Sequence, residues 1–171
     1  MASVQRAGIF VLAAATLTLS ACVSAPPVQE LAFVYTDEEF GRYAVDGDAT
    51  VTGQAFLRQR GGGVVVCAGA PVVLFPKTPT FDRAVETARA GKQPMPATGS
   101  DERFKKVARI ATCDAQGNFT FERLPRARWY VFSRVTWEVA DSPQGGELVG
   151  EVDTSAGGEH RVLLTDANRV H

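Results

Sequence analysis

Short stretches in which apolar and polar residues alternate, each followed by turn-forming residues, recur through most of the chain. One face of the first stretch is formed by Val51, Gly53, Ala55 and Leu57. A spacing of two is typical of a half-buried β-strand. Residues 72–75 form a continuous apolar run that Pro76 closes, as expected of a well-buried strand. These stretches predict an all-β fold.

Further strands are expected at residues 107–113, 118–122, 129–139, 148–152 and 160–165. The longest has one face made of Trp129, Val131, Val135, Trp137 and Val139, and an opposite face that carries Tyr130 and Phe132. Residues 142–146 contain Ser, Pro and Gly and are expected to connect this strand to the next. Short strands separated by turn signals predict an antiparallel β-sandwich.

A helical segment interrupts this pattern between residues 77 and 106. Phe81, Val85 and Ala88 recur at helical spacing, with charged residues between them. Gly91 and two later prolines end the predicted helix. We expect this segment to be an insertion between strands and not a second domain.

The first 21 residues have the layout of an export signal. Arg6 is their single charged residue, and the apolar run that follows is about a dozen residues long, short of the ~20 that span a bilayer. Leu19, Ser20, Ala21 and Cys22 then resemble the lipobox of bacterial lipoproteins, in which small residues precede a cysteine that is acylated. An ordinary secretory signal with an incidental Cys22 is the alternative, and it predicts a mature protein that is free in solution.

The lipobox resemblance implies three segments in the precursor. Residues 1–21 are the lipoprotein signal peptide, residues 22–48 are a lipid tether and lead-in, and residues 49–171 are the folded domain. Aromatic residues between 33 and 43 are expected to pack on the domain as a strand or an irregular lead-in. Acylated Cys22 would bind the bilayer, and Val23 after it favours the periplasmic face of the outer membrane by resemblance to lipoprotein sorting.

Charge and cysteine content limit the partners and cofactors. The chain has 18 Lys and Arg against 19 Asp and Glu, so no basic excess suggests nucleic acid. Once Cys22 is assigned to lipid, Cys67 and Cys113 remain as a candidate disulfide in an oxidising compartment, with two buried free thiols as the alternative. We expect no metal site and no cofactor, because no Cys-x-x-Cys occurs and His160 and His171 are the only histidines.

A longer resemblance covers residues 49–165. Residues 113–125 contain an Asp-Gly turn, two alternating phenylalanines and a Leu-Pro pair, and a Tyr-Val strand follows at Tyr130. This pattern resembles the carboxypeptidase regulatory-like domain, which implies a Greek-key, transthyretin-like β-sandwich that serves as a non-catalytic accessory. The chain departs from that family at residues 126–128, where the family has a small residue and Gly.

The expected function is therefore that of a non-enzymatic envelope module, structural or interacting, whose partner is an envelope protein or polysaccharide. The candidate binding surface comprises Arg58, Gln59, Arg60, Tyr130 and Phe132. The alternative is that both aromatic rings are buried between the sheets. A carbohydrate-binding module or a divergent hydrolase using His160 is the rival function. The adjacent carboxylates Glu38 and Glu39 are expected to be solvated.

Overall fold

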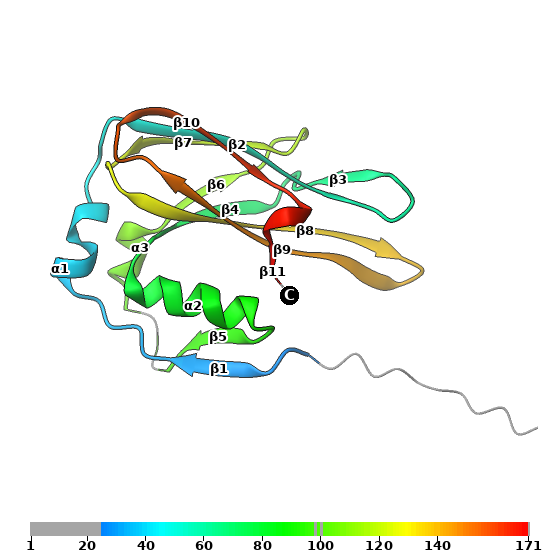
Figure 1. Ribbon diagram of the computed structural model, residues 1–171, viewed down its shortest axis with the longest axis horizontal. Coiled ribbons are helices and arrows are strands. Elements are labelled where there is room, and N and C mark those ends of the chain that lie inside the picture. The colour runs from blue at the N-terminus through cyan, green and yellow to red at the C-terminus, as the bar shows by residue number, and fades with distance from the viewer. Residues whose placement is uncertain (1–24, 98, 100, 171) are drawn as a thin grey trace, which may run out of the picture.

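The computed structural model describes residues 25–97, 99 and 101–170. Two sheets pack face to face (Figure 1). The first contains β2 (Ala49–Arg58), β3 (Val64–Val66), β7 (Asn118–Leu124) and β10 (Gly158–Leu164). The second has the order β11 (Arg169–Val170), β9 (Ser142–Asp153), β8 (Arg128–Val139), β4 (Pro71–Pro76) and β6 (Arg109–Thr112). The predicted all-β sandwich with a short helical insertion is confirmed.

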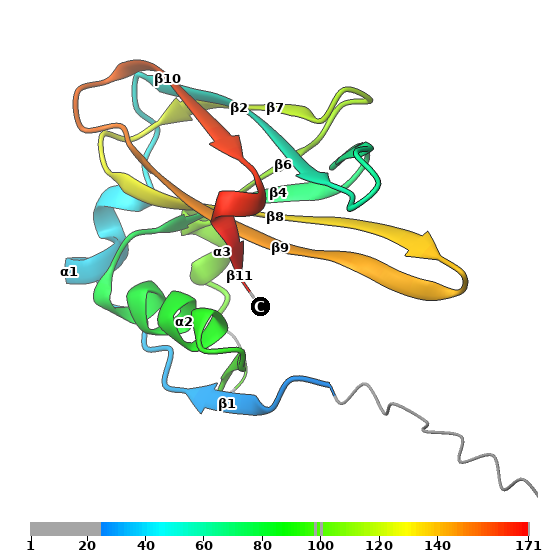
Figure 2. The same cartoon turned by 45° about the vertical axis from the view of Figure 1, so that its right-hand side comes forward.

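The core lies between the two sheets and follows the predicted alternation. Val51 and Leu57 of β2 and Trp129 and Val131 of β8 are fully buried there. At the far end of β8 the alternation continues, but Val139 is exposed because the β8–β9 hairpin extends beyond the first sheet (Figure 2). The distal part of this hairpin therefore has little to pack against.

Two details of the predicted sandwich are wrong. β10 runs parallel to β2, whereas an antiparallel arrangement was expected. The chain enters β10 from β9 in the other sheet, so no hairpin with β2 sets its direction. Residues 142–146 belong to β9 and pair with β8, while the connection is a tight turn at Ala140 and Asp141, both with positive φ.

The insertion contains the predicted helix, α2 (Pro79–Arg89), which lies along the outer face of the second sheet (Figure 1). Its apolar side chains pack on Tyr130 and Val149 of that sheet. The insertion also contains β5 (Gln93–Pro96) and a short helix, α3 (Phe104–Val107). β5 pairs in parallel with β1 (Val28–Leu31), so part of the expected tether forms a strand that was not predicted.

The aromatic lead-in packs on the domain, as expected, but as helix and not as strand. It forms α1 (Asp37–Phe40) and a 3₁₀ turn, η1 (Gly41–Tyr43). Phe40 and Tyr43 are fully buried, and the ring of Tyr43 lies edge-on to Trp129 at 4.9 Å between centroids. The hydroxyl of Tyr43 is 3.2 Å from the carbonyl oxygens of both Lys77 and Arg128. This segment therefore closes one end of the sandwich.

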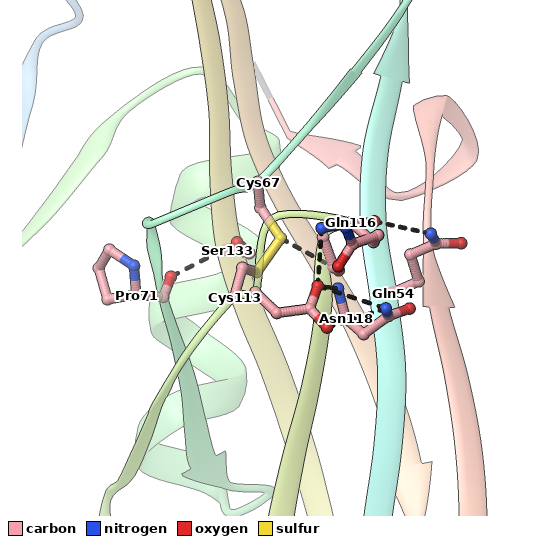
Figure 3. Close-up of a disulfide and its surroundings, with 9 residues drawn as sticks. Gln54, Cys67, Pro71, Cys113, Gln116, Asn118 and Ser133 are labelled. Carbon is pink, nitrogen blue, oxygen red and sulfur yellow. Dashed lines mark hydrogen bonds between the residues drawn. A yellow bond between two sulfur atoms is a disulfide. The ribbon is translucent and has the colours of Figure 1, made fainter.

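A disulfide joins Cys67, after β3, to Cys113, after β6, with 5.8 Å between the Cα atoms (Figure 3). The predicted bridge is thus present in the structure. Beside it, the carboxylate of Asp114 accepts hydrogen bonds from the backbone N–H groups of Gln116 and Asn118, at 2.9 and 2.8 Å. Hydrogen bonds from the Asn118 side chain and from these backbone groups hold the pKa of Asp114 below its usual range.

The predicted N-terminal signal and Cys22 lie outside the described residues, as does His171. Among the residues that are described, no helix is long and apolar enough to cross a membrane.

Candidate functional site

A pocket of about 460 Å³ lies between the outer face of the second sheet and the helical insertion. Its floor is Val73, Phe75, Tyr130, Phe132 and Val149, from β4, β8 and β9. Its wall is the apolar face of α2, at Phe81, Ala84, Val85 and Ala88. Phe33, Phe104 and the β5 residues Gln93, Pro94 and Pro96 complete the lining, with Glu147 at the rim. The insertion thus converts a flat sheet face into a concave site.

The strand register explains why the floor is apolar. Val73 of β4 is paired with Phe132 of β8, and Phe132 is paired in turn with Val149 of β9. Phe75 is paired with Tyr130 in the neighbouring row. Because side chains alternate along a strand, these positions point away from the core that Trp129 and Val131 fill. β4 and β8 are therefore apolar on both faces.

Aromatic rings form much of the wall. Phe81 of α2 stacks on Phe75 with 5.1 Å between centroids, and Phe33 and Phe104 meet Phe81 at 6.0 Å each. All four rings are only partly buried. A group of half-exposed rings around a cavity is a common mark of a binding site.

A polar network closes one end of the pocket. The hydroxyl of Tyr130 donates to Asp82 at 2.6 Å and accepts from the ammonium group of Lys77 at 2.8 Å. Lys77 also forms an ion pair with Glu151 at 3.0 Å. Burial and the hydrogen bond to Asp82 raise the pKa of Tyr130. Burial acts to lower the pKa of Lys77, but its bonds to Tyr130 and Glu151 outweigh burial and raise it. The tyrosine is therefore neutral and the lysine charged at neutral pH.

At the rim, the side chain of Glu147 forms an ion pair with Arg134 across the β8–β9 ladder. Gln93 is exposed at the end of α2 where β5 begins. The carboxylates and cations named at the two ends of the pocket are thus paired with one another. The pocket surface between them is formed mostly by apolar side chains.

The structure separates the predicted candidate surface into two parts. Tyr130, which is 4% exposed, and the half-buried Phe132 lie in the pocket, not between the sheets. Arg58, Gln59 and Arg60 lie where β2 turns toward β3, away from α2 (Figures 1 and 2), and do not line the pocket. The backbone N–H of Arg58 instead donates to Asp166 at 3.3 Å.

Phe33, Phe75 and Phe104 line the pocket but were not predicted from the sequence as site residues. The helical spacing of Phe81, Val85 and Ala88 was the available signal, because an amphipathic helix must cover an apolar surface somewhere. The spacing does not indicate which face of which sheet the helix covers. The rival site residue His160 lies on β10, with its Nε2 atom 3.0 Å from the carbonyl oxygen of Gly157. Over the described ranges, no three His, Cys, Asp or Glu side chains are grouped to hold a metal ion.

The prediction that Glu39 is solvated is wrong, because its carboxylate caps α2. It accepts from the backbone N–H of Thr80 at 3.0 Å and lies 3.2 Å from the Thr80 hydroxyl. A carboxylate there satisfies a free N–H group at the start of the helix and suits the helix dipole. α1 therefore positions the helix that forms the pocket wall.

Replacing Glu39 with alanine is expected to lower the free energy of unfolding by about 1 kcal/mol, the usual effect of losing a helix cap. Urea unfolding followed by circular dichroism would measure it. Glu38→Ala is the matched control, since Glu38 is exposed on the same short helix. Equal stability of the two variants would show that the cap contributes nothing.

Comparison with known proteins relates this chain to others by fold alone. No protein-family model matches it, and no curated protein matches it. A crystal structure from Pseudomonas aeruginosa, of a protein provisionally described as carbohydrate binding, is 24% identical with a TM-score of 0.64 and covers 77% of this chain and 97% of its own. The major pilin subunit of Bacillus cereus is 10% identical, with a TM-score of 0.37 over 69% of this chain and 30% of its own. The similarity to the Pseudomonas protein shows that the two chains share the β-sandwich fold.

Proposed function

We propose that this protein is a lipoprotein of the bacterial envelope, anchored by acylated Cys22, whose β-sandwich domain binds a ligand without catalysing a reaction. The observation that carries the proposal is the apolar pocket formed by α2, β5 and the outer face of the second sheet. Concave, mostly apolar sites of this size are where proteins generally hold small ligands. The ionisable groups at its ends are paired with one another, which suits binding better than proton transfer.

The proposal includes membership of the carboxypeptidase regulatory-like family. Supporting it, the Asp114 side chain forms the turn that the family pattern requires, and Gly117 has a φ of 79° there. Phe119 and Phe121 then enter the core from β7. We also propose the periplasmic face of the outer membrane as the location, on the basis of Val23 after the lipobox cysteine.

Carbohydrate binding is the second candidate function. It is favoured by the similarity to the Pseudomonas structure, of which this chain covers 97%. Partly buried Phe132 in the pocket offers an aromatic face on which a sugar ring could stack. Turnover of an envelope-derived ester or amide that is lost in His160→Ala would instead support the hydrolase and contradict the non-catalytic proposal.

Replacement of Cys22 with alanine tests the anchor. The wild-type protein is expected in the membrane fraction of the cells that make it, because several acyl chains hold a protein stably in a bilayer. Cys22→Ala should remain unprocessed or become soluble, and immunoblots of fractionated cells would measure both effects. Ser24→Ala, two residues later, is the matched control and should behave as wild type. Unchanged processing and membrane association of Cys22→Ala would contradict the proposal.

A further inference from the structure

We infer that the pocket takes a single acyl chain of a membrane lipid, and not a sugar. The inference rests on the proposed function, since it deepens the ligand class of the same site. Four features support it: the chemistry of the lining, the pairing of the polar groups, the size of the cavity and its distance from the anchor.

The lining offers a sugar almost no hydrogen-bond partners. The floor and the wall are phenylalanine, valine and alanine side chains, together with the ring of Tyr130. A sugar placed there would bury hydroxyl groups against carbon, and burying a polar group without a hydrogen-bond partner is unfavourable. A hydrocarbon chain has no such groups, and every methylene that it buries adds to the affinity.

The polar groups at the ends of the pocket are already engaged. Tyr130 bonds with Asp82 and Lys77, and Lys77 also pairs with Glu151. A sugar would have to share Tyr130 and Glu147 with the partners that these two residues already have. An acyl chain would leave these contacts intact and keep its own polar head at the rim, beside Glu147 and Arg134.

The volume suits one chain. At about 460 Å³ the cavity falls within the roughly 300–1,000 Å³ range of small-molecule sites. Its aromatic walls are held by packing between Phe75 and Phe81, so the space does not depend on exposed flexible side chains. Apolar cavities of this kind bind apolar molecules in preference to water.

The N-terminal anchor brings the pocket close to a bilayer. Five residues lie between Cys22 and Val28, so even a fully extended chain of six Cα-to-Cα steps spans at most about 22 Å. Val28 begins β1, which pairs along its length with the pocket strand β5. The pocket is therefore tethered near the membrane surface, where lipid acyl chains are the abundant apolar ligand.

Photo-cross-linking of the full-length acylated protein tests the inference. The protein would be reconstituted into vesicles of phosphatidylethanolamine and phosphatidylglycerol that contain a phosphatidylethanolamine with a diazirine in its acyl chain. Mass spectrometry should locate the adducts on α2 and on the peptides that carry Phe75 and Phe132. A second lipid with the diazirine in its headgroup should not label these residues. Acyl-chain adducts confined to other parts of the protein, or absent, would overturn the inference.

Pocket-filling variants provide the control for site. Ala84→Phe and Ala88→Phe place a ring in the cavity and should each reduce the pocket adducts about tenfold or more, because a packed ring leaves no room for the chain. Ala90→Phe makes the same change at the exposed end of α2 and should label as wild type. Thermal unfolding would establish that each variant is folded. If a variant does not fold, the positions of the adducts in the wild-type protein still test whether the acyl chain enters the pocket.

Two further outcomes separate the inference from the proposed function. Binding of maltotetraose that Ala84→Phe abolishes, measured by calorimetry, would overturn the acyl-chain inference and leave a ligand-binding lipoprotein. A wild-type protein that fails to partition with membranes would overturn the anchored function itself.

Discussion

Replacing both Cys67 and Cys113 with alanine is expected to lower the free energy of unfolding by about 4 kcal/mol. The bridge closes a loop over a sequence separation of 46 residues, and the chain-entropy relation gives this value for a loop of that length. Both cysteines are almost fully buried, so the substitutions also remove packed sulfur atoms. An effect of this size is a large share of the total stability of a small domain.

Urea unfolding of the oxidised wild type, the dithiothreitol-reduced wild type and the double alanine variant would measure the effect. The reduced wild type is the matched control, because it keeps both sulfur atoms and loses only the bond. It should lose most of the stability that the double variant loses. If the reduced and oxidised proteins unfold at the same urea concentration, or if two thiols of the native protein react with an alkylating agent, the bridge does not stabilise this fold.

The bridge also matters for the position of the pocket floor. Cys67 precedes β4 and Cys113 follows β6, so the bond joins the ends of two paired strands of the second sheet. The loop that it closes contains all of the insertion, from α2 to α3. The bridge therefore keeps the two ends of this loop together in the unfolded chain as well.

The elements that sequence predicts well are those whose pattern is local. The alternation along β8 places Trp129 inward and Phe132 outward, because the pleat permits no other arrangement of successive side chains. The spacing of Phe81 and Val85 predicts α2 because residues four apart lie on the same face of a helix. The disulfide was predicted from the number of cysteines together with the predicted export signal.

The elements that sequence does not predict depend on distant partners. β1 and β5 are four residues each, and β5 contains two prolines. They are held by pairing between segments more than 60 residues apart. Glu39 caps a helix that begins 40 residues later in the chain. The parallel direction of β10 follows from its entry from another sheet, which no local turn signal encodes.

The residues of the candidate site also divide into those predicted from local pattern and those that depend on distant partners. Tyr130 and Phe132 could be assigned to the face opposite the core, since that depends on strand period alone. Their place in a pocket depends on which face the insertion covers, a choice made by packing across the sheet. Arg58 and Arg60 were grouped with them by chemistry, but β2 and β8 belong to different sheets.

A buried threonine stabilises the corner that follows Leu124 and Pro125. The hydroxyl of Thr154, fully buried in the turn after β9, accepts from the backbone N–H of Ala127 at 3.1 Å and from the indole N–H of Trp129 at 3.2 Å. It lies 2.9 Å from the carbonyl oxygen of Pro125, to which it can donate. One side chain thus satisfies the polar groups of this corner.

Thr154→Val is therefore expected to lower the free energy of unfolding by about 3 kcal/mol. Valine keeps the shape of threonine but leaves two buried N–H groups without a partner, and each such group costs roughly 1–3 kcal/mol. Urea unfolding followed by the fluorescence of buried Trp129 would measure the change. Thr154→Ser is the matched control: it keeps the hydroxyl, loses one methyl group, and should cost only about 1 kcal/mol. A valine variant at least as stable as the serine variant would show that packing of the methyl group, and not the hydrogen bonds of the hydroxyl, holds this corner together.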